Sequence, residues 1–274
     1  MAEKTIKQKK ARVPDGKHAP VKLNVYGLDG KIAGEAELPT AFKADYRPDL
    51  IRRAVTAMEA NARQPYGPKP TAGTRHAVST WGKGRGVARV QRLKGSSRAA
   101  QSPNNVGGRR AHPPKVDKDL GKKINKKEIH QAKMAALHAT SVPEIVRGRG
   151  HQFDEELTVP VIVKDDFESI KSTKDAIESL SSIGVYADVA RAKNGRKIRP
   201  GKGKMRGRKY RSPRGILVIV SDECDGGRSI RNLAGIEVVT PKALNASVLA
   251  PGGDPGRLTM ITETALAEIG RWGE

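Results

Sequence analysis

Cysteine is almost absent from this sequence of 274 residues, since Cys224 is the only one. A single cysteine cannot form an intramolecular disulfide, nor can it supply the several thiolates of a structural zinc site. No apolar run approaches the roughly 18 residues that a membrane-spanning helix needs. The N-terminal residues also lack the apolar core of a secretory signal. We therefore expect an intracellular protein with no disulfide framework, no thiolate-rich zinc site and no membrane span.

Acidic residues are missing from two long segments, although the chain has 29 of them against 52 Lys and Arg, a net charge of +23. Residues 63–115 (the first basic segment) contain 12 Lys or Arg, and residues 191–214 (the second basic segment) contain another 12. The rest of the chain is close to neutral. Solvated surfaces mix both signs, so segments without any acid repel themselves unless a polyanion neutralises them. A nucleic-acid partner is expected, with an anionic membrane surface or an acidic protein as alternatives.

Aromatic residues are also scarce, and the first basic segment has no apolar period that predicts a helix or a strand. It is rich in Gly and Pro instead, with 8 and 6 respectively. Such a composition is typical of a non-regular loop that orders on its partner. Arginine gives forked contacts to phosphate oxygens, and Trp81 and Tyr66 offer faces for base stacking. We expect an extended arm that threads into folded RNA.

The remaining sequence alternates between patterns typical of strands and of helices. Strands are expected at residues 21–25, 32–38, 159–163, 185–189, 216–220, 236–239 and 258–261, and helices at 48–62, 125–139, 168–182, 229–233 and 263–272. Asn125 and Glu128 have the spacing of a capping box. Pro160 indicates a strand start or an edge strand. The fold class is therefore α/β, a largely parallel sheet with flanking helices, plus a long basic loop and a shorter basic insertion.

Enzyme chemistry finds little support in the sequence. Gly82, Gly84 and Gly86 lack the Rossmann spacing and follow no strand, and the glycines of the second basic segment fail the Walker A spacing. The six histidines are dispersed. Cys224 follows an apolar strand, where α/β active sites form, but its acidic neighbours should raise the pKa of the thiol rather than activate it. We expect no enzyme, no catalytic residue, no metal and no cofactor.

Three ordered motifs resemble the universal L-four family of large-subunit ribosomal proteins, in its archaeal branch. They are residues 81–90 (Trp-Gly-Lys-Gly-Arg-Gly-Val-Ala-Arg-Val) with residues 106–114 (Val-Gly-Gly-Arg-Arg-Ala-His-Pro-Pro), residues 208–215 (Arg-Lys-Tyr-Arg-Ser-Pro-Arg-Gly) and residues 249–257 (Leu-Ala-Pro-Gly-Gly-Asp-Pro-Gly-Arg). The chain length favours the archaeal over the eukaryotic branch. The sequence departs from the family pattern in a basic extension over residues 1–20, and in Asp254, where the related motif often has His.

The resemblance implies a structural protein of the large ribosomal subunit that supports assembly, with partners in large-subunit ribosomal RNA and in neighbouring ribosomal proteins. It also implies that the loop tip lines the nascent-peptide exit tunnel and meets the passing peptide; the tunnel-proximal residues would be Trp81, Lys83, Arg85, Arg89 and Arg92. The full set of RNA-binding residues expected from the basic segments and the resemblance is Arg63, Lys69, Arg75, Trp81, Lys83, Arg85, Arg89, Arg92, Lys94, Arg98, Arg109, Arg110, His112, Lys115, Arg196, Lys197, Arg199, Lys202, Lys204, Arg206, Arg208, Lys209, Tyr210, Arg211 and Arg214.

The expected organisation is a basic extension over residues 1–20 and one α/β domain over residues 21–274. The RNA-penetrating loop (63–118) and the basic insertion (191–214) interrupt this domain.

The alternative function is a general nucleic-acid chaperone or DNA-compacting protein. An α/β nuclease or RNA-modifying enzyme would need acids or a cofactor loop near the basic segments, and those segments have no acid. A membrane-surface role would need a basic amphipathic helix, which the Pro and Gly content of the segments opposes. Neither a membrane nor a small-molecule substrate is expected as a partner.

Overall fold

The computed structural model describes residues 22–222 and 224–273, so the expected basic extension over residues 1–20 lies outside the described residues. The chain separates into two compact units. One unit, the body, comprises the described residues up to Met58 and those from Lys123 onward, and the other comprises Glu59–Lys122. The second basic segment belongs to the body. No helix of the described residues is long and apolar enough to cross a membrane.

The centre of the body is a six-stranded sheet in the order β2-β1-β5-β10-β8-β9. Its strands are β1 (Lys22–Tyr26), β2 (Ile32–Glu37), β5 (Val161–Val163), β8 (Leu217–Ile219), β9 (Glu237–Val239) and β10 (Thr259–Thr262). The hairpin β1–β2 is antiparallel, and every other pairing is parallel. The predicted α/β class with a largely parallel sheet is thus confirmed.

Side chains of the central strands alternate between two apolar cores, one on each face of the sheet. Ile162, Ile219 and Ile261 enter one core, and Val163 and Val218 enter the other. Parallel strands that are covered on both faces read as continuous apolar runs. This explains why residues 216–220 are the most apolar run of the sequence, and why all five are buried.

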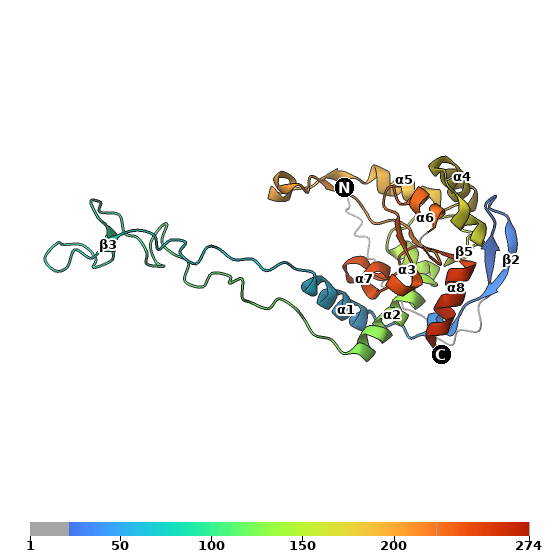
Figure 1. Ribbon diagram of the computed structural model, residues 1–274, viewed down its shortest axis with the longest axis horizontal. Helices are drawn as coiled ribbons and strands as arrows, with labels where there is room; N and C mark the ends of the chain where they lie inside the picture. Colours follow the sequence, from blue (N-terminus) through green and yellow to red (C-terminus); the bar gives the residue numbers. More distant parts are fainter. Residues whose placement is uncertain (1–21, 223, 274) are drawn as a thin grey trace, which may run out of the picture. The chain divides into compact units, whose positions relative to one another are not determined.

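Helices cover both faces of this sheet (Figure 1). The first core holds residues of α1 (Pro48–Asn61), α2 (Lys126–Thr140), α7 (Ala246–Leu249) and α8 (Glu263–Gly270). The second core holds residues of α3 (Pro143–Gly148), α4 (Thr173–Ile183), α5 (Tyr186–Asn194) and α6 (Asp225–Ile230). Short 3-10 helices lie at Thr40–Lys43, Asp165–Ser169, Lys202–Arg206, Pro241–Ala243, Pro251–Gly253 and Arg271–Gly273.

One predicted strand is wrong, because residues 185–189 begin α5 instead. Val185, Val189 and Ala192 are buried at helical spacing, and together they place one face of α5 against the sheet. Asp188 is also buried. The apolar residues of this short run fit both periods, and tertiary packing decides in favour of the helix.

Smaller corrections concern element ends. The helix predicted from residue 168 begins at Thr173, where the Ser172 hydroxyl accepts a hydrogen bond from the Lys174 amide at 3.2 Å. Asn125 is the N-cap of α2, but its side chain makes no capping hydrogen bond, so the predicted capping box is absent. Strand β5 begins directly after Pro160, as one of the two interpretations required. It is not an edge strand, since it lies between β1 and β10.

Candidate nucleic-acid interface

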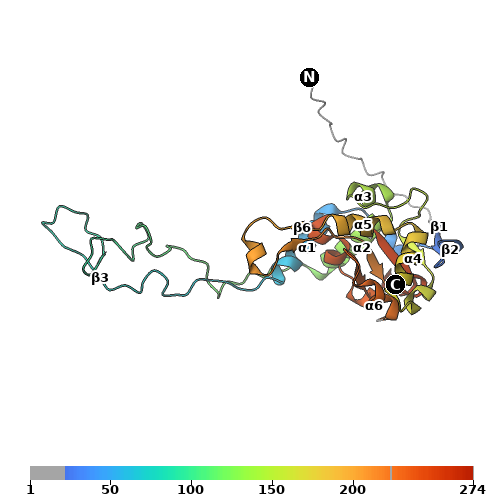
Figure 2. The same ribbon diagram turned by 90° about the horizontal axis from the view of Figure 1, so that it is seen from above.

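The first basic segment forms two limbs that run side by side, an outgoing limb (residues 63–78) and a returning limb (residues 99–115), as both views show (Figure 1, Figure 2). Gln101 joins them, since its Nε2 donates to the carbonyls of Thr74 at 3.0 Å and His76 at 2.6 Å. Glycine permits the close approach: a Cβ on Gly73, where φ is +78°, would lie 2.7 Å from the Cα of Arg109. The limbs are therefore joined by hydrogen bonds from one side chain to the opposite backbone and by a close backbone approach at Gly73.

The loop tip (residues 79–98) is closed by a minimal strand pair, β3 (Val78–Ser79) with β4 (Arg92–Leu93). Arg92 organises the tip: its guanidinium lies 5.1 Å from the ring centroid of Trp81, and it donates to the carbonyls of Ser97 and Ala88. A guanidinium over an indole ring is attracted to the ring face in a cation–π contact. The tip thus presents a cation and an aromatic ring in one arrangement.

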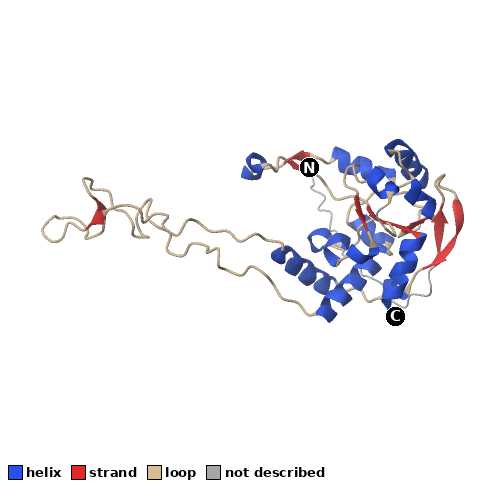
Figure 3. Cartoon of the chain, viewed as in Figure 1, coloured by secondary structure: helices blue, strands red, loops and turns tan. Residues whose placement is uncertain are grey.

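Almost nothing in this unit is buried. Between residues 59 and 122, all of which are described, only Ala60 and Ala100 are buried. Every Lys and Arg of the first basic segment is exposed except the half-buried Arg92. No carboxylate occurs in residues 63–115 that could pair with these cations locally. The unit consists almost entirely of loop (Figure 3), so the sequence-based expectation of a non-regular segment without a core is confirmed.

The second basic segment folds into a short hairpin, in which β6 (Lys197–Ile198) pairs with β7 (Tyr210–Arg211). Tyr210 lies between two cations, with the Arg196 guanidinium 4.2 Å and the Lys209 ammonium 5.5 Å from its ring centroid. The predicted RNA-binding side chains from residue 196 to 211 are exposed, apart from the half-buried Arg199. The sequence did not indicate this hairpin, whose strands are only two residues each.

The two ends of this segment are anchored to the body by acids that lie outside it. Arg191 donates from Nε to Asp188 Oδ1 at 2.8 Å and from Nη2 to the Arg214 carbonyl at 2.9 Å. Arg214 donates to Glu237 Oε2 at 3.2 Å. Of the predicted RNA-binding residues, Arg214 therefore already has an acidic partner within the protein, whereas the residues of the hairpin have none in the described chain.

Cys224, the best catalytic candidate of the sequence, has a structural role. Its Sγ accepts a hydrogen bond from the Gly227 amide at 3.2 Å and caps α6. Burial raises the pKa of this thiol, and the nearby Glu168 carboxylate raises it further. The predicted direction is confirmed, but burial and Glu168 cause the shift rather than the neighbours in sequence. Among the described residues, no group of three or more His, Cys, Asp or Glu could hold a metal ion.

At the carboxyl end of the parallel strands, next to Cys224, the polar side chains already form hydrogen bonds with one another. Glu168 accepts from the Ser221 hydroxyl at 2.7 Å, the Ser221 amide at 2.8 Å and the Thr262 hydroxyl at 2.8 Å. This carboxylate thus joins the ends of β8 and β10. A carboxylate that joins two strands through three hydrogen bonds has a structural role.

Comparison with known proteins agrees with this arrangement. Residues 36–272 match the ribosomal protein L4/L1 family. The chain belongs to this family. It is 49% identical over 249 residues to large ribosomal subunit protein uL4 of Methanocaldococcus jannaschii, covering 91% of this chain and 98% of that protein. The proteins of the same name from Methanosphaera stadtmanae and Archaeoglobus fulgidus are 47% and 46% identical, covering 91% and 92% of this chain and 96% and 99% of theirs.

The L4/L1 family match confirms the resemblance inferred from the three motifs, including its archaeal branch. The chain is therefore a ribosomal protein with a structural rather than an enzymatic role. Two of the predicted tunnel-proximal residues, Trp81 and Arg92, contact each other in the tip. Lys83, Arg85 and Arg89 are exposed around them. Arg63, Lys69 and Arg75 lie on the outgoing limb, and Arg109, Arg110, His112 and Lys115 on the returning limb.

Proposed function

We propose that this protein binds large-subunit ribosomal RNA through its two basic segments, and that the loop tip lines the nascent-peptide exit tunnel. On this proposal the body anchors two RNA-binding insertions, residues 63–118 and 191–214, and contacts neighbouring ribosomal proteins. The single observation that carries the proposal is the first basic segment, whose two limbs and tip together carry 12 cations, nearly all exposed, and no acid. Such a segment is stable in one conformation only when a polyanion surrounds it.

The tip supports contact with single-stranded or folded RNA rather than with duplex grooves. RNA-binding proteins stack unpaired bases on aromatic rings and arginine planes, and the tip presents Trp81 beside Arg92. Gly82, Gly84 and Gly86 have φ between 64° and 78°, and a Cβ added to any of them would have no other heavy atom within 4 Å. The backbone of this stretch is thus open to close approach by phosphates.

A salt titration tests the electrostatic part of the proposal. A triple variant, Lys83→Gln, Arg85→Gln and Arg89→Gln, should bind ribosomal RNA less tightly and with a shallower salt dependence. The slope of log K against log salt should fall by about 2 to 3, since each phosphate contact contributes about 0.7 to 0.9. The matched control neutralises Lys171, Lys174 and Arg228, which are exposed on the body. An equal loss in both variants would indicate nonspecific charge attraction.

Deletion of the tip tests its place in the ribosome. We expect a chain without residues 79–98 to keep the circular dichroism of the body, because no residue of the tip is buried. Large subunits assembled with this chain should be defective in assembly or in passage of the nascent peptide. Loss of the body's fold on deletion would instead mean that the tip stabilises a core.

The alternative of a general nucleic-acid chaperone differs in two measurable ways. It predicts similar affinity for duplex DNA and for structured RNA, and no stoichiometric association with the large subunit. Co-sedimentation of the native protein with purified large subunits at about 0.5 M salt decides between them, since nonspecific phosphate contacts weaken steeply as salt rises.

A further inference from the structure

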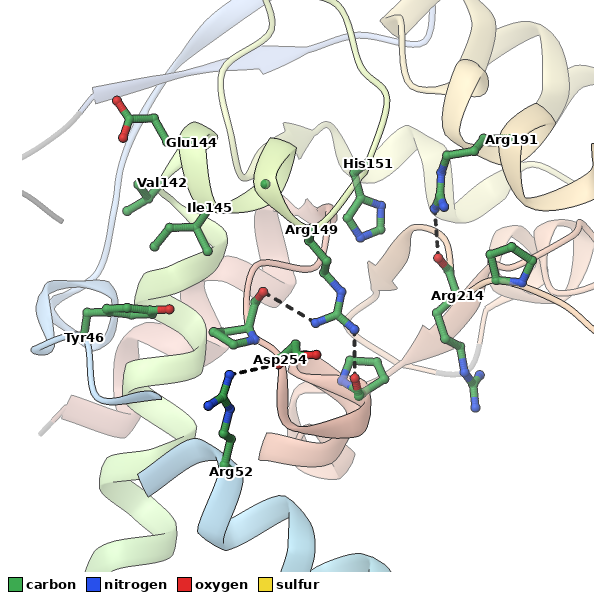
Figure 4. A pocket seen from close by; sticks show the side chains of 14 residues that line it. Tyr46, Arg52, Val142, Glu144, Ile145, Arg149, His151, Arg191, Arg214 and Asp254 are labelled. Atoms are coloured by element: carbon green, nitrogen blue, oxygen red, sulfur yellow. Dashed lines mark hydrogen bonds and ion pairs between the residues drawn. The ribbon is translucent and has the colours of Figure 1, made fainter. Parts of the chain in front are cut away.

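A cavity of about 740 Å³ opens in the body at the base of the second basic segment (Figure 4). Its size lies within the range of about 300 to 1,000 Å³ that is typical of small-molecule sites. Its wall comes from four parts of the chain: residues 46–52, residues 142–151 around α3, the two ends of the second basic segment, and the Pro- and Gly-rich motif of residues 251–255. All of these belong to the body.

Arg149 occupies the middle of this cavity (Figure 4). Its guanidinium donates to the carbonyls of Pro251 at 2.9 Å and Pro255 at 3.5 Å, which leaves three of its five N–H groups without a protein acceptor. Burial lowers the pKa of Arg149, and the charge of the nearby Arg257 lowers it further, whereas Asp254 opposes the shift. No carboxylate forms an ion pair with Arg149 in the described chain, so this half-buried cation is poorly compensated.

Other charges around the cavity are paired in a way that leaves an excess of positive charge. Arg52 contacts Asp254 at 3.4 Å, and the wall also includes Arg191 and Arg214, the first and last residues of the second basic segment. Glu144 and Asp254 are the acids of the wall. Arg191 and Arg214 are paired with Asp188 and Glu237, which do not line the cavity, so Arg149 is the one arginine of the wall without an acidic partner among the described residues.

The rest of the wall is apolar or aromatic. Tyr46 stands at one side with its hydroxyl directed inward, beside Val142 and Ile145, and the prolines complete the lining (Figure 4). A phosphate needs guanidinium donors, whereas a nucleobase needs flat or apolar surface. This cavity offers both at once.

We propose that the cavity binds one unstacked nucleotide of the RNA strand that contacts the second basic segment. Its phosphate lies on Arg149 and its base lies against Tyr46 and the apolar wall. This assignment rests on the proposed RNA-binding function and adds a site whose central residue, Arg149, lies outside both basic segments. Splayed nucleotides held by arginine and an aromatic ring are a common mode of RNA recognition.

Gly148 provides a sharp test, because it lines the cavity and nothing lies within 4 Å of a Cβ added to it. The variants Gly148→Glu and Gly148→Gln have nearly the same size and differ in charge. The control is Gly34→Glu, since Gly34 on β2 also has open space around an added Cβ and lies outside the cavity. The full-length proteins are titrated with a fluorescein-labelled single-stranded RNA 12-mer of mixed sequence.

We expect Gly148→Glu to weaken RNA binding by about 5- to 10-fold and to lower the salt slope by about 1. The decrease in the logarithm of RNA affinity for Gly148→Gln should be less than half of that for Gly148→Glu. The RNA affinity of Gly34→Glu should stay within about 2-fold of the wild type. Arg149→Gln should reproduce the loss and the change in slope. Circular dichroism and thermal melting of each variant confirm that the body is folded.

Two results would overturn the assignment. If Gly148→Glu and Arg149→Gln, both folded, bind the 12-mer with wild-type affinity and slope, RNA does not enter the cavity. If adenosine 5′-monophosphate binds saturably to the wild type but not to Gly148→Glu, while RNA affinity is unchanged, the cavity belongs to a free nucleotide. Neither result contradicts the proposed function, which the triple tip variant and co-sedimentation with large subunits test separately.

Discussion

Replacement of Asp188 by alanine should destabilise the body strongly, because this carboxylate joins three donors in a buried site. It is fully buried, and its Oδ1 accepts from His151 Nδ1 at 3.1 Å, the Gln152 amide at 3.2 Å and Arg191 Nε at 2.8 Å. Alanine leaves all three donors without their acceptor. It also releases Arg191, which fixes the start of the second basic segment.

The expected size follows from the burial. Breaking a buried ion pair by removing one partner costs about 3 to 5 kcal/mol. For a domain of this size each kcal/mol lowers Tm by roughly 2 to 4 °C, so Asp188→Ala should melt about 6 to 20 °C below the wild type. Asp188→Asn keeps an acceptor at Oδ1 and should cost about 1.5 to 3 kcal/mol, the value of a hydrogen bond to a charged group.

The loss should depend on pH. Burial raises the pKa of Asp188, but hydrogen bonds from His151 and Arg191 and their charges lower it more, so that the folded pKa lies below the unfolded value of 3.8. The charged carboxylate therefore stabilises the fold above pH 3.8, and this contribution is lost as the pH falls through the folded pKa. The difference in unfolding free energy between wild type and Asp188→Asn should shrink as the pH falls below about 4.

Urea unfolding followed by circular dichroism, repeated between pH 3 and pH 7, measures both quantities. The control is Glu178→Gln, because Glu178 pairs with Lys174 on the exposed face of α4 at 4.0 Å. Such a surface pair contributes about 0.3 to 0.5 kcal/mol. The reasoning is refuted if Asp188→Ala costs no more than Glu178→Gln, or if the loss in Asp188→Asn stays the same down to pH 3.

Three further substitutions test other parts of the chain. Gly30→Ala should lower Tm by several degrees, since φ is +74° and a Cβ would lie 2.1 Å from the Ser182 carbonyl oxygen; Gly34→Ala, with open space, should leave Tm unchanged in the same melting scan. Arg92→Ala should speed protease cleavage in the loop tip without changing the melting of the body, because Arg92 holds two tip carbonyls. Burial lowers the pKa of Lys133 from 10.5 to about 8. Between these two pH values the unfolded chain binds more protons than the folded chain, so the free energy of unfolding should rise with pH. In Lys133→Met, followed by urea unfolding from pH 7 to 11, that rise should disappear.

Much of the fold could be predicted because the sheet is parallel and buried. Runs such as residues 216–220 are apolar at every position, and the Asp-Gly turn of the first hairpin is a strong local signal. The error at residues 185–189 has the opposite cause. The apolar residues of this short run fit both periods, and packing of α5 against the sheet decides between them. The pair of Asp188 with Arg191 has helical i,i+3 spacing and is local, whereas the other partner of Asp188, His151, lies 37 residues earlier in the chain.

The candidate interface also has one part that local sequence predicts and one part that depends on distant residues. Charge composition located both basic segments, because the absence of acid is a property of the sequence itself. The cavity around Arg149 could not be predicted from the sequence, because its wall combines four distant stretches and Arg149 lies in a region of mixed charge. The Pro- and Gly-rich motif of residues 249–257 was the one available signal. By sequence this motif indicates only the family, whereas in the structure carbonyls of the motif hold Arg149 in place.

The acids near the second basic segment show how a body of mixed charge can hold a strongly basic hairpin in place. Asp188 and Glu237 bind the arginines at its two ends, whereas the cations of the hairpin have no acid in their own segment. Paired charges at the ends fix the position of the hairpin, and unpaired charges along it remain free to bind phosphates. Carboxylates within the hairpin would pair with the same arginines and compete with RNA for them. The proposed RNA binding thus requires a segment without acid and tolerates acid at the two anchoring points, which is the distribution found in the chain.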